Sequence, residues 1–236
     1  MTTFSVIGPG KLGTSLLIRL NQFTKPIFYH RRPDQVAAKL GQSVTLEEAA
    51  QADIVFLTVK PSSIKDLCRE LKGKIGHNSV IVSVIAGVSK AFLCRSLETD
   101  NVIRAMFSLA IGYVNFPVTI HLFGSSPDLE PLGNIVYASN EDYIDQVTAE
   151  YACGLGFILR FYQAYRSICT DQQCLDELFL SVPQMIGVSD DPIADVACKG
   201  GATERGLKHL TDLESMIGRA VQSAQDRCTE IKNSYI

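Results

Sequence analysis

The sequence lacks the features that define several large classes of protein. No stretch approaches the ~18 consecutive apolar residues needed to cross a bilayer, and the N-terminus has no charged region followed by an apolar one. Lysine and arginine (22) nearly balance aspartate and glutamate (25), and the basic residues form no long cluster. We therefore expect a soluble, cytoplasmic protein whose partners include neither membranes nor nucleic acid.

The cysteines also lack any pattern that would indicate cross-links or metal binding. Their number, seven, is odd, and no two of them have C-x-x-C spacing. Neither a disulfide framework nor a zinc site is indicated, and no other metal is expected. Most of the thiols should be reduced residues of the core. They occur at Cys68, Cys94, Cys153, Cys169, Cys174, Cys198 and Cys228.

A glycine-rich turn near the N-terminus organises the chain. The apolar residues 4–7 predict a strand, and leucines at helical spacing follow the turn G-x-G-x-x-G. Gly8 permits the tight turn, Gly10 lets the backbone approach a pyrophosphate, and Gly13 lets the helix pack closely on the strand. The pattern indicates a strand, phosphate loop and helix that bind a dinucleotide. The alternative is a turn with a purely structural role.

The end of the second predicted strand indicates which dinucleotide is bound. An NAD site usually has Asp or Glu about twenty residues after the loop, to hold the ribose 2′-hydroxyl. This chain has His30, Arg31 and Arg32 there. A guanidinium group matches a 2′-phosphate in charge and geometry, which favours NADPH over NADH. The alternative is that the two arginines are solvated surface residues.

Two further strands end in segments suited to the same ligand edge. The nearly continuous apolar run 53–59 is typical of a central parallel strand, and Lys60 and Pro61 follow it. The next strand, 79–85, ends in the small residues Ala86 and Gly87, which would let a ligand come close. In open α/β sheets, ligands bind at the carboxyl ends of the strands. Lys60 could equally be an exposed lysine, and Ala86 and Gly87 an ordinary loop.

The order of elements predicts an α/β chain of two domains. Strands alternate with helices to about residue 100, which is typical of a doubly wound parallel sheet. The runs 101–106, 118–122 and 134–138 have no helices between them and predict an antiparallel or mixed edge. We expect residues 1–144 to form an NADP-binding domain of Rossmann type and residues 145–236 an all-helical domain.

The expected helical domain is rich in apolar residues. Helices are predicted over 155–168, over 175–186 with Pro183 kinking or ending it, and from about 204 to 232. Because three helices cannot easily enclose so many apolar side chains, we expect a homodimer in which they interleave. Before the last helix, Gly200, Gly201, Ala202 and Thr203 could offer N–H groups and a hydroxyl to a small anion. The alternative is a capping turn with Thr203 as the N-cap.

With both ends in view, the chain resembles pyrroline-5-carboxylate reductase, the NAD(P)H-dependent enzyme that makes proline from its cyclic imine. The segment of residues 199–207, K-G-G-A-T-E-R-G-L, is the most particular of the matching motifs. The others are the glycine loop 8–13, F-L-T-V-K-P at 56–61, S-V-I-A-G-V at 83–88, V-I-R-A-M at 102–106 and D-Q-V-T-A at 145–149.

The resemblance implies roles for particular residues. It implies a helical domain that dimerises and completes the site. The nucleotide would be held by Gly8, Pro9, Gly10, Lys11, Leu12, Gly13, His30, Arg31, Arg32, Val59, Lys60, Pro61, Ala86 and Gly87. The substrate carboxylate would be bound by Cys198, Gly200, Gly201, Ala202 and Thr203, with the Thr203 hydroxyl near the imine nitrogen as the catalytic group. Hydride transfer itself belongs to the cofactor.

Several segments depart from the pattern of that family. Where the family usually has Pro-Asn-Thr-Pro, this chain has F-S-L-A at 107–110, and Cys198 and Lys199 replace a serine and a proline. The segment 150–156 also differs, and the helical region 165–195 is shorter than is usual. Losing one buried polar contact costs about 1–3 kcal/mol, so the substrate pocket is less closely matched than the nucleotide loop.

Three functions are compatible with these observations. The first is NADPH-dependent reduction of a small cyclic imine, most simply 1-pyrroline-5-carboxylate to proline. The second is reduction of a different imine or keto acid on the same scaffold, because the segments 107–110 and 150–156 are altered. The third is a catalytically silent NADP-binding sensor or partner protein.

Overall fold

A computed structural model describes residues 2–113, 115–125, 129–197 and 199–235. The chain forms two compact units. One, the sheet unit, contains residues 1–153 and 223–236, and the other, the helical unit, contains residues 154–222. This division differs from the expected boundary after residue 144. The difference arises because the segment before residue 153 and the last turns of the chain pack on the sheet.

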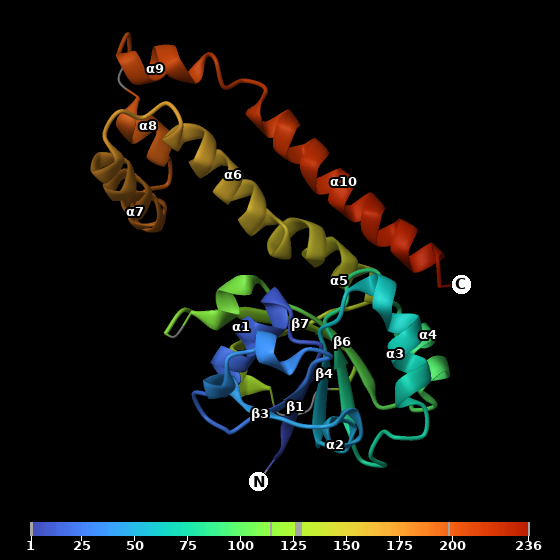
Figure 1. Ribbon diagram of the computed structural model, residues 1–236. Coiled ribbons are helices and arrows are strands. Elements are labelled where there is room, and N and C mark those ends of the chain that lie inside the picture. Colours follow the sequence, from blue (N-terminus) through green and yellow to red (C-terminus); the bar gives the residue numbers. More distant parts are fainter. Residues whose placement is uncertain (1, 114, 126–128, 198, 236) are drawn as a thin grey trace. The chain divides into compact units, whose positions relative to one another are not determined.

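The sheet unit is built on one eight-stranded sheet with the order β3-β2-β1-β4-β5-β6-β7-β8 (Figure 1). Strands β1 to β6 are parallel, β7 runs antiparallel to β6, and β8 is parallel to β7. The expected doubly wound sheet with a mixed edge is confirmed. The strands are β1 Phe4–Ile7, β2 Ile27–Tyr29, β3 Gln42–Ser43, β4 Ile54–Leu57, β5 Val80–Ser83, β6 Val102–Met106, β7 Thr119–Phe123 and β8 Asn134–Tyr137.

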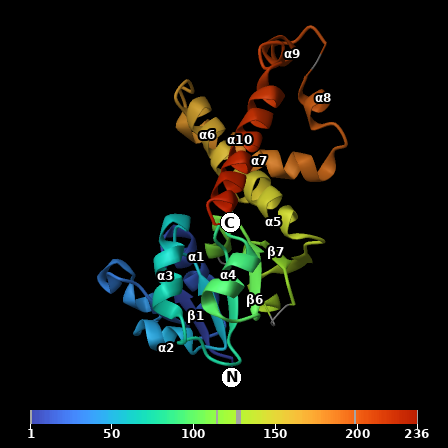
Figure 2. The same ribbon diagram turned by 90° about the vertical axis from the view of Figure 1, so that its right-hand side faces the viewer.

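Helices cover both faces of this sheet. Helix α1 (Lys11–Leu20) packs on one face together with the 3-10 turn Leu109–Gly112, and α2 (Leu46–Ala50), α3 (Ile64–Leu71) and α4 (Lys90–Leu97) pack on the other. Figures 1 and 2 show α1 and the pair α3 and α4 on opposite sides of the strands. Strands β1 and β4 are buried along their whole length, which explains their continuous apolar sequences.

Local signals explain where several helices begin. Thr45 and Glu48 form a reciprocal capping box at the start of α2, and the Ser89 hydroxyl accepts a hydrogen bond from the Phe92 N–H at the start of α4. The Asn140 side chain caps α5 (Glu141–Val147) through the Tyr143 N–H. Each cap satisfies a backbone donor that the helix itself leaves unpaired.

The last part of the sheet unit is a helix that returns to the sheet. Helix α5 continues into a π-helical segment, Thr148–Ala152, and Ile144 and Val147 pack with Met106 of β6. The last turns of α10 (Leu213–Asn233) bring Ile231 and then Tyr235 against the face that α3 and α4 cover. These contacts give the sheet unit its own closed core.

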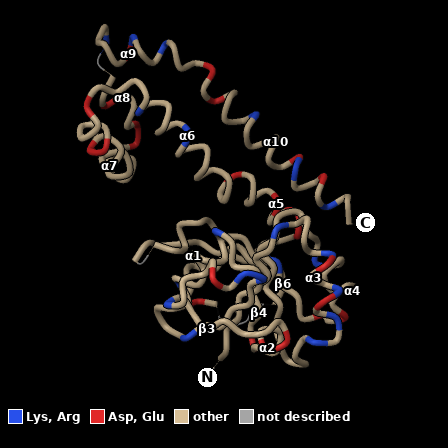
Figure 3. Tube along the Cα trace, viewed as in Figure 1, with Lys and Arg blue, Asp and Glu red and all other residues tan. Residues whose placement is uncertain are grey.

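The helical unit has very few buried side chains. It contains α6 (Gly154–Arg166), α7 (Gln172–Val188), α8 (Pro192–Val196), α9 (Ala202–Leu207) and the first part of α10. Among its described residues, Leu175 alone is buried. Figure 3 shows α6 with few charges along its length, whereas charges of both signs alternate along α10. Many large apolar side chains of this unit are exposed to solvent.

Pro183 lies inside α7 and does not end it, because the helix continues to Val188. One detail of the predicted helices is wrong. The long helix expected over 204–232 is two helices, because α9 ends at Leu207 and a new helix begins after Asp212, whose carbonyl accepts a hydrogen bond from the Met216 N–H. Threonine and aspartate at 211–212 favour helix starts over helix interiors, which explains the break.

Among the described residues, no helix combines the length and hydropathy that crossing a bilayer requires. The same residues contain no group of three His, Cys, Asp or Glu side chains placed to hold a metal ion. The expected cytoplasmic location stays a prediction.

Candidate nucleotide site

The glycine loop joins β1 to α1 with the geometry that its sequence predicts. Gly8 has φ +78°, and a Cβ atom there would lie 2.2 Å from the Val59 side chain. A Cβ at Gly13 would lie 2.4 Å from the Thr58 hydroxyl oxygen. Both positions therefore exclude larger residues for reasons of packing and backbone conformation.

Gly10 differs from these two glycines because open space surrounds it. No heavy atom lies within 4 Å of where its Cβ would be, and it is the N-cap of α1 without a side-chain cap. In the described part of the chain, the N–H groups of Lys11, Leu12 and Gly13 meet no acceptor. The first turn of α1 also has no acidic residue. Free N–H groups, a helix dipole and open space fit a pyrophosphate.

A cavity of about 340 Å³ adjoins the loop on the side of β2 and β4. Its lining comes from the carboxyl ends of β1, β2 and β4 and from the first turns of α3, which meet because the three strands are parallel neighbours. The lining residues are Ile7, Gly8, Gly10, Tyr29, His30, Arg31, Arg32, Thr58, Val59, Lys60, Ser63 and Leu67. Seven of these twelve residues were predicted to bind the nucleotide: Gly8, Gly10, His30, Arg31, Arg32, Val59 and Lys60.

The three residues after β2 occupy different positions. The His30 ring nitrogen Nδ1 lies 3.1 Å from the Arg32 backbone nitrogen, which donates to it, and 2.7 Å from the Arg32 carbonyl oxygen. Arg31 forms an ion pair with Glu70 of α3, with 2.8 Å between Nη2 and Oε1. Within the described residues, the Arg32 side chain has no ion pair or hydrogen bond, so its guanidinium is available to a ligand anion.

The segment after β4 contributes a second basic group to the cavity. Val59 and Lys60 line it, and within the described part of the chain the Lys60 ammonium has no ion-pair partner. Pro61 begins the 3-10 turn Pro61–Ser63, and its carbonyl accepts a hydrogen bond of 2.5 Å from the Tyr235 hydroxyl. The end of the chain thereby holds the turn that carries Lys60.

Ala86 and Gly87 follow β5 but do not line this cavity. Gly87 has φ +69°, and a Cβ there would lie 2.6 Å from the Cys228 carbonyl oxygen and 2.7 Å from Ile231. Glycine is therefore required at residue 87 to let α10 pack against the turn. Its role in nucleotide binding stays a prediction.

A second hollow, of about 630 Å³, lies on the other side of the loop. It shares Gly10 and His30 with the first cavity and adds Leu109 and Tyr113 from the segment after β6. Tyr113 is 67% exposed and Leu109 is 41% exposed, so both side chains present apolar surface beside the glycine loop. Pro9 and Lys11 also line this hollow.

Sequence reasoning missed five residues that line the first cavity: Ile7, Tyr29, Thr58, Ser63 and Leu67. The Thr58 hydroxyl donates a hydrogen bond to the Gly8 carbonyl (3.0 Å) and packs against Gly13. These two contacts hold the glycine loop against the end of β4. Ser63 is the N-cap of α3, and Leu67 lies one turn further along that helix. Their spacing of four residues at the start of a helix that follows a ligand-edge strand was a usable signal.

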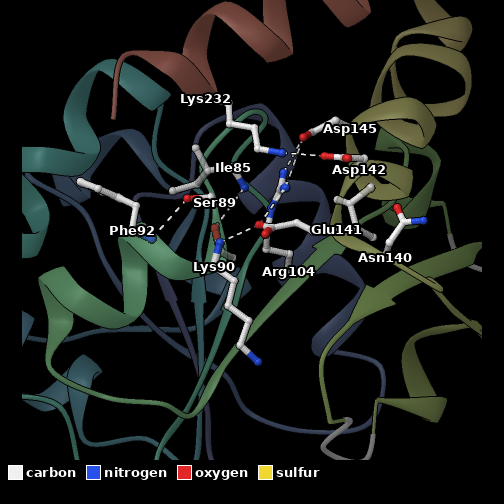
Figure 4. Close-up of polar contacts among 12 residues, drawn as sticks. Ile85, Ser89, Lys90, Phe92, Arg104, Asn140, Glu141, Asp142, Asp145 and Lys232 are labelled. Carbon is white, nitrogen blue, oxygen red and sulfur yellow. Dashed lines mark hydrogen bonds and ion pairs between the residues drawn. The ribbon is translucent and has the colours of Figure 1, made fainter. Parts of the chain in front are cut away.

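Beyond the cavity, a polar cluster connects β6 with α4, α5 and α10 (Figure 4). Arg104 of β6 is 1% exposed, and its Nη2 atom lies 2.7 Å from Oδ1 of Asp145, while Nη1 lies 3.2 Å from Oε1 of Glu141. The Lys232 ammonium lies 2.6 Å from Asp142, and it lowers the pKa of that carboxyl group. The Glu141 carboxylate also accepts a hydrogen bond of 2.6 Å from the backbone N–H at the start of α4.

The predicted carboxylate loop lies in the helical unit. Gly200 has φ +75°, and its N–H donates to the Glu204 carboxylate at 2.7 Å. Gly201, and not Thr203, is the N-cap of α9, so the capping role considered for Thr203 is wrong. In the described residues, the Ala202 and Thr203 N–H groups and the Thr203 hydroxyl have no hydrogen-bond partner. Cys198, the remaining predicted substrate residue, lies outside the described residues.

The fold and the glycine-loop cavity define an α/β protein with a Rossmann-type sheet and a first helix that begins with unpaired N–H groups. Residues 3–87 match the family described as NADP oxidoreductase, coenzyme F420-dependent. The match covers the glycine loop, the arginines after β2 and the first parallel strands. It therefore coincides with the part of the chain that forms the cavity.

Comparisons over the whole chain lead to a more particular group of proteins. Pyrroline-5-carboxylate reductase from Staphylococcus aureus (strain COL) is 26% identical over 224 residues, covering 84% of this chain and 82% of that protein. The structure of the NADP-bound pyrroline carboxylate reductase of Plasmodium falciparum superposes with a TM-score of 0.81 at 17% identity, covering 98% of both chains. That of Streptococcus pyogenes 1-pyrroline-5-carboxylate reductase gives 0.81 at 19% identity, covering 97% of this chain and 98% of that one. The expected fold class and the resemblance to pyrroline-5-carboxylate reductases are confirmed.

Proposed function

We propose that this protein is an NADPH-dependent reductase of a small cyclic imine, most simply 1-pyrroline-5-carboxylate to L-proline. The observation that carries the proposal is the glycine loop, where open space at Gly10 meets three unpaired N–H groups of α1. The similarity to pyrroline-5-carboxylate reductases over 84% of the chain supports the substrate. An anion-binding helix start beside a basic cavity suits a phosphorylated dinucleotide.

The sheet unit holds the nucleotide in this proposal. The first turn of α1 binds the pyrophosphate through the N–H groups of Lys11, Leu12 and Gly13. Arg32 and Arg31 face the ribose 2′-phosphate, because they follow β2 and line the cavity. Lys60, which follows β4, adds a further positive charge to the cavity lining. Val59, Pro61, Ala86 and Gly87 position the nicotinamide end.

The loop that begins α9 binds the substrate carboxylate. The unpaired N–H groups of Ala202 and Thr203 donate to it, with Gly201 allowing close approach. The Thr203 hydroxyl lies at the imine nitrogen and helps to keep it protonated, which makes the adjacent carbon a better hydride acceptor. When bound, NADPH supplies the hydride, and the protein's task is to align donor and acceptor carbons within about 3–3.5 Å.

The helical unit forms a homodimer interface in this proposal. Large apolar side chains are exposed on several of its helices, including Ile158 (65%), Leu180 (72%) and Ile186 (64%). Exposed apolar patches of this kind mark protein–protein contacts, and a second copy would cover them with an identical surface.

A reductase of a different imine or keto acid is the second candidate. It is favoured by Leu109 and Tyr113, which place apolar surface beside the glycine loop. Such a wall would suit a substrate with an apolar substituent. A panel of cyclic imines and 2-keto acids, assayed by NADPH oxidation, distinguishes the two candidates.

The proposed nucleotide site is tested with the variant Gly10→Val. The open space at Gly10 and its ordinary φ of −77° let the fold accept a side chain, but that side chain would occupy the pyrophosphate position. We expect an unchanged melting temperature without nucleotide and a loss of at least about tenfold in NADPH affinity. Gly218→Val, which also has open space, is the control and should bind NADPH normally.

The same experiment separates the remaining possibilities. Binding of NADPH by the wild-type protein without turnover of any substrate in the panel would support a silent NADP-binding protein. If Gly10→Val bound NADPH as well as the wild-type protein, the glycine loop would not be the nucleotide site.

The proposed substrate-binding role of Thr203 is tested with the variants Thr203→Ala and Thr203→Ser. We expect Thr203→Ala to lower kcat/KM by about 10- to 100-fold, since one hydrogen bond to a charged group contributes about 1.5–3 kcal/mol. NADPH affinity should not change. Thr203→Ser keeps the hydroxyl and should keep most of the activity, and a similar loss in both variants would argue against a role for that hydroxyl.

A further inference from the structure

One acidic side chain contacts a predicted phosphate-binding residue of the cavity wall, although it does not itself line the cavity. Glu70 lies on α3, and its Oε1 atom is 2.8 Å from Nη2 of Arg31. Ser63, the N-cap of α3, and Leu67 line the cavity, and Glu70 follows them at helical spacing one turn beyond the lining. An acidic group thus reaches the 2′-phosphate end of the site from α3, and not from the end of β2.

The neighbouring charges make this contact specific. Asp66, the other acidic residue of α3, pairs with Arg69 on its own helix. Asp34 follows the arginines in sequence, but in the described part of the chain it forms no ion pair with either of them. Glu70 is therefore the carboxylate that partly neutralises the basic wall.

The contact leaves the two arginines in different states. Arg31 is held by a single contact between one guanidinium nitrogen and one carboxylate oxygen, with side chains 62% and 41% exposed. An exposed pair of this kind is weak and can exchange partners. Arg32 has no such competitor among the described residues. A ligand phosphate can bind Arg32 directly, but it must draw Arg31 away from Glu70.

We propose that Glu70 is a specificity-determining residue that competes with the ribose 2′-phosphate of NADPH for Arg31. This inference rests on the proposed nucleotide site. The Glu70 charge opposes the phosphate and has no comparable effect on the uncharged 2′-hydroxyl of NADH. Glu70 thereby narrows the difference in affinity between the two nucleotides, and the protein can bind NADH better than its two arginines would otherwise permit.

The test measures binding and not turnover. The dissociation constants of NADPH and NADH are determined by titration of the full-length protein at low salt, for wild type and Glu70→Gln. Removing one exposed charge near the phosphate should tighten NADPH binding about two- to fivefold and change NADH binding by less than about 1.5-fold. The gain should shrink in about 0.5 M salt, because exposed charges are screened.

A matched control uses another exposed pair. Lys72 and Glu98 are 2.8 Å apart with similar exposure, 59% and 58%, and neither residue lines the cavity. Glu98→Gln has the same change in net charge and should alter neither dissociation constant. If it tightened NADPH binding as much as Glu70→Gln, the effect would come from net charge and the proposal would be overturned.

A double-mutant cycle tests whether Glu70 acts through Arg31. In the Arg31→Gln background, Glu70→Gln should tighten NADPH binding by less than half as much as in wild type. Weaker NADPH binding by the single variant Glu70→Gln would mean that Glu70 orients Arg31 for the phosphate, and it would overturn the competition. Equal effects on NADPH and NADH would overturn it as well.

These results are distinguishable from failure of the proposed function. If the wild-type protein bound neither nucleotide, both the nucleotide site and the role of Glu70 would be contradicted. If it bound and oxidised NADPH with substrate while Glu70→Gln left both affinities unchanged, the role of Glu70 alone would be contradicted.

Discussion

The sheet unit and the helical unit bury their apolar side chains in different ways. Residues such as Leu17 of α1, Leu57 of β4 and Leu71 of α3 have no exposed surface. In the helical unit, side chains of the same kind are open to solvent, and Val188 is 86% exposed. Both units are rich in apolar residues, so composition does not distinguish them.

The difference lies in what each unit can enclose by itself. Parallel strands bury both faces of a sheet beneath helices that the same chain supplies. A few helices of 154–222 cannot cover one another in the same way, and α6 and α7 keep apolar surface on several sides. We therefore expect the sheet unit to be stable as a monomer, and the proposed second copy to cover the helical unit.

The largest effect is expected from charges placed on the helical unit. Leu180→Glu combined with Ile186→Glu puts two carboxylates on α7 where side chains are 72% and 64% exposed. Burying unpaired charges is costly, so we expect the proposed dimer to dissociate to monomers at micromolar concentration. Sedimentation velocity measures the change.

A control on the sheet unit makes this test discriminating. Tyr137 of β8 is 62% exposed, and Tyr137→Glu should leave the dimer intact. If Tyr137→Glu produced monomers and the α7 variant did not, the interface would belong to the sheet unit. A wild-type protein that sediments as a monomer would contradict the dimer altogether.

A smaller effect, on stability, is expected inside the sheet unit. Arg104→Met leaves the carboxylates of Asp145 and Glu141 without their buried partner. Breaking a buried ion pair from one side costs about 3–5 kcal/mol of unfolding free energy. Arg227→Met breaks the exposed pair with Glu230, whose side chains are 69% and 63% exposed, and should cost less than about 1 kcal/mol. Denaturant titration that gave equal losses would contradict the assigned role of burial.

The smallest effect is a dependence of stability on pH. His121 of β7 lies between the rings of Tyr143 and Tyr151, and burial lowers its pKa below the ordinary value of 6.5. As the pH falls below about 6.5, the unfolded chain binds a proton that the folded chain resists, so this residue makes stability decrease toward acid. Between pH 7.5 and pH 5, we expect the melting temperature of His121→Gln to fall less than that of the wild-type protein.

The exposed His77 provides the control for this pH effect. Over the same pH range, the melting temperature of His77→Gln should fall by as much as that of the wild-type protein. An identical pH profile for His121→Gln and wild type would show that His121 titrates as it does in the unfolded chain.

Much of the fold could be predicted because local signals were strong. The apolar runs that became β1, β4 and β6 are strands, and the mixed edge followed from the missing helices after residue 106. The two-residue strand β3 was missed, since a pair such as Gln42 and Ser43 carries no periodicity. The break before Leu213 was missed because apolar spacing continues through it while the backbone does not.

The candidate site was predictable where its residues are neighbours in sequence. The glycine loop, the residues after β2 and Lys60 line or border one cavity, as the parallel-sheet argument requires. Leu67 was not foreseen, although its spacing from Ser63 was a usable signal. Glu70 was not foreseen because its contact with Arg31 joins segments that are distant in the sequence. The position of Gly87 against Ile231 depends on residues separated by most of the chain.

Sequence alone was sufficient for the glycine turn, for the preference for strands and helices, and for the resemblance to a family of reductases, because each depends on residues close together in the chain. Tertiary structure was needed to show that Arg31 has an ion-pair partner whereas Arg32 has none among the described residues. It was also needed to show that Thr203 is not the N-cap of α9, and that α6 and α7 expose apolar side chains. These properties depend on the charges and surfaces that distant segments bring together. Periodicity in a sequence does not contain that information.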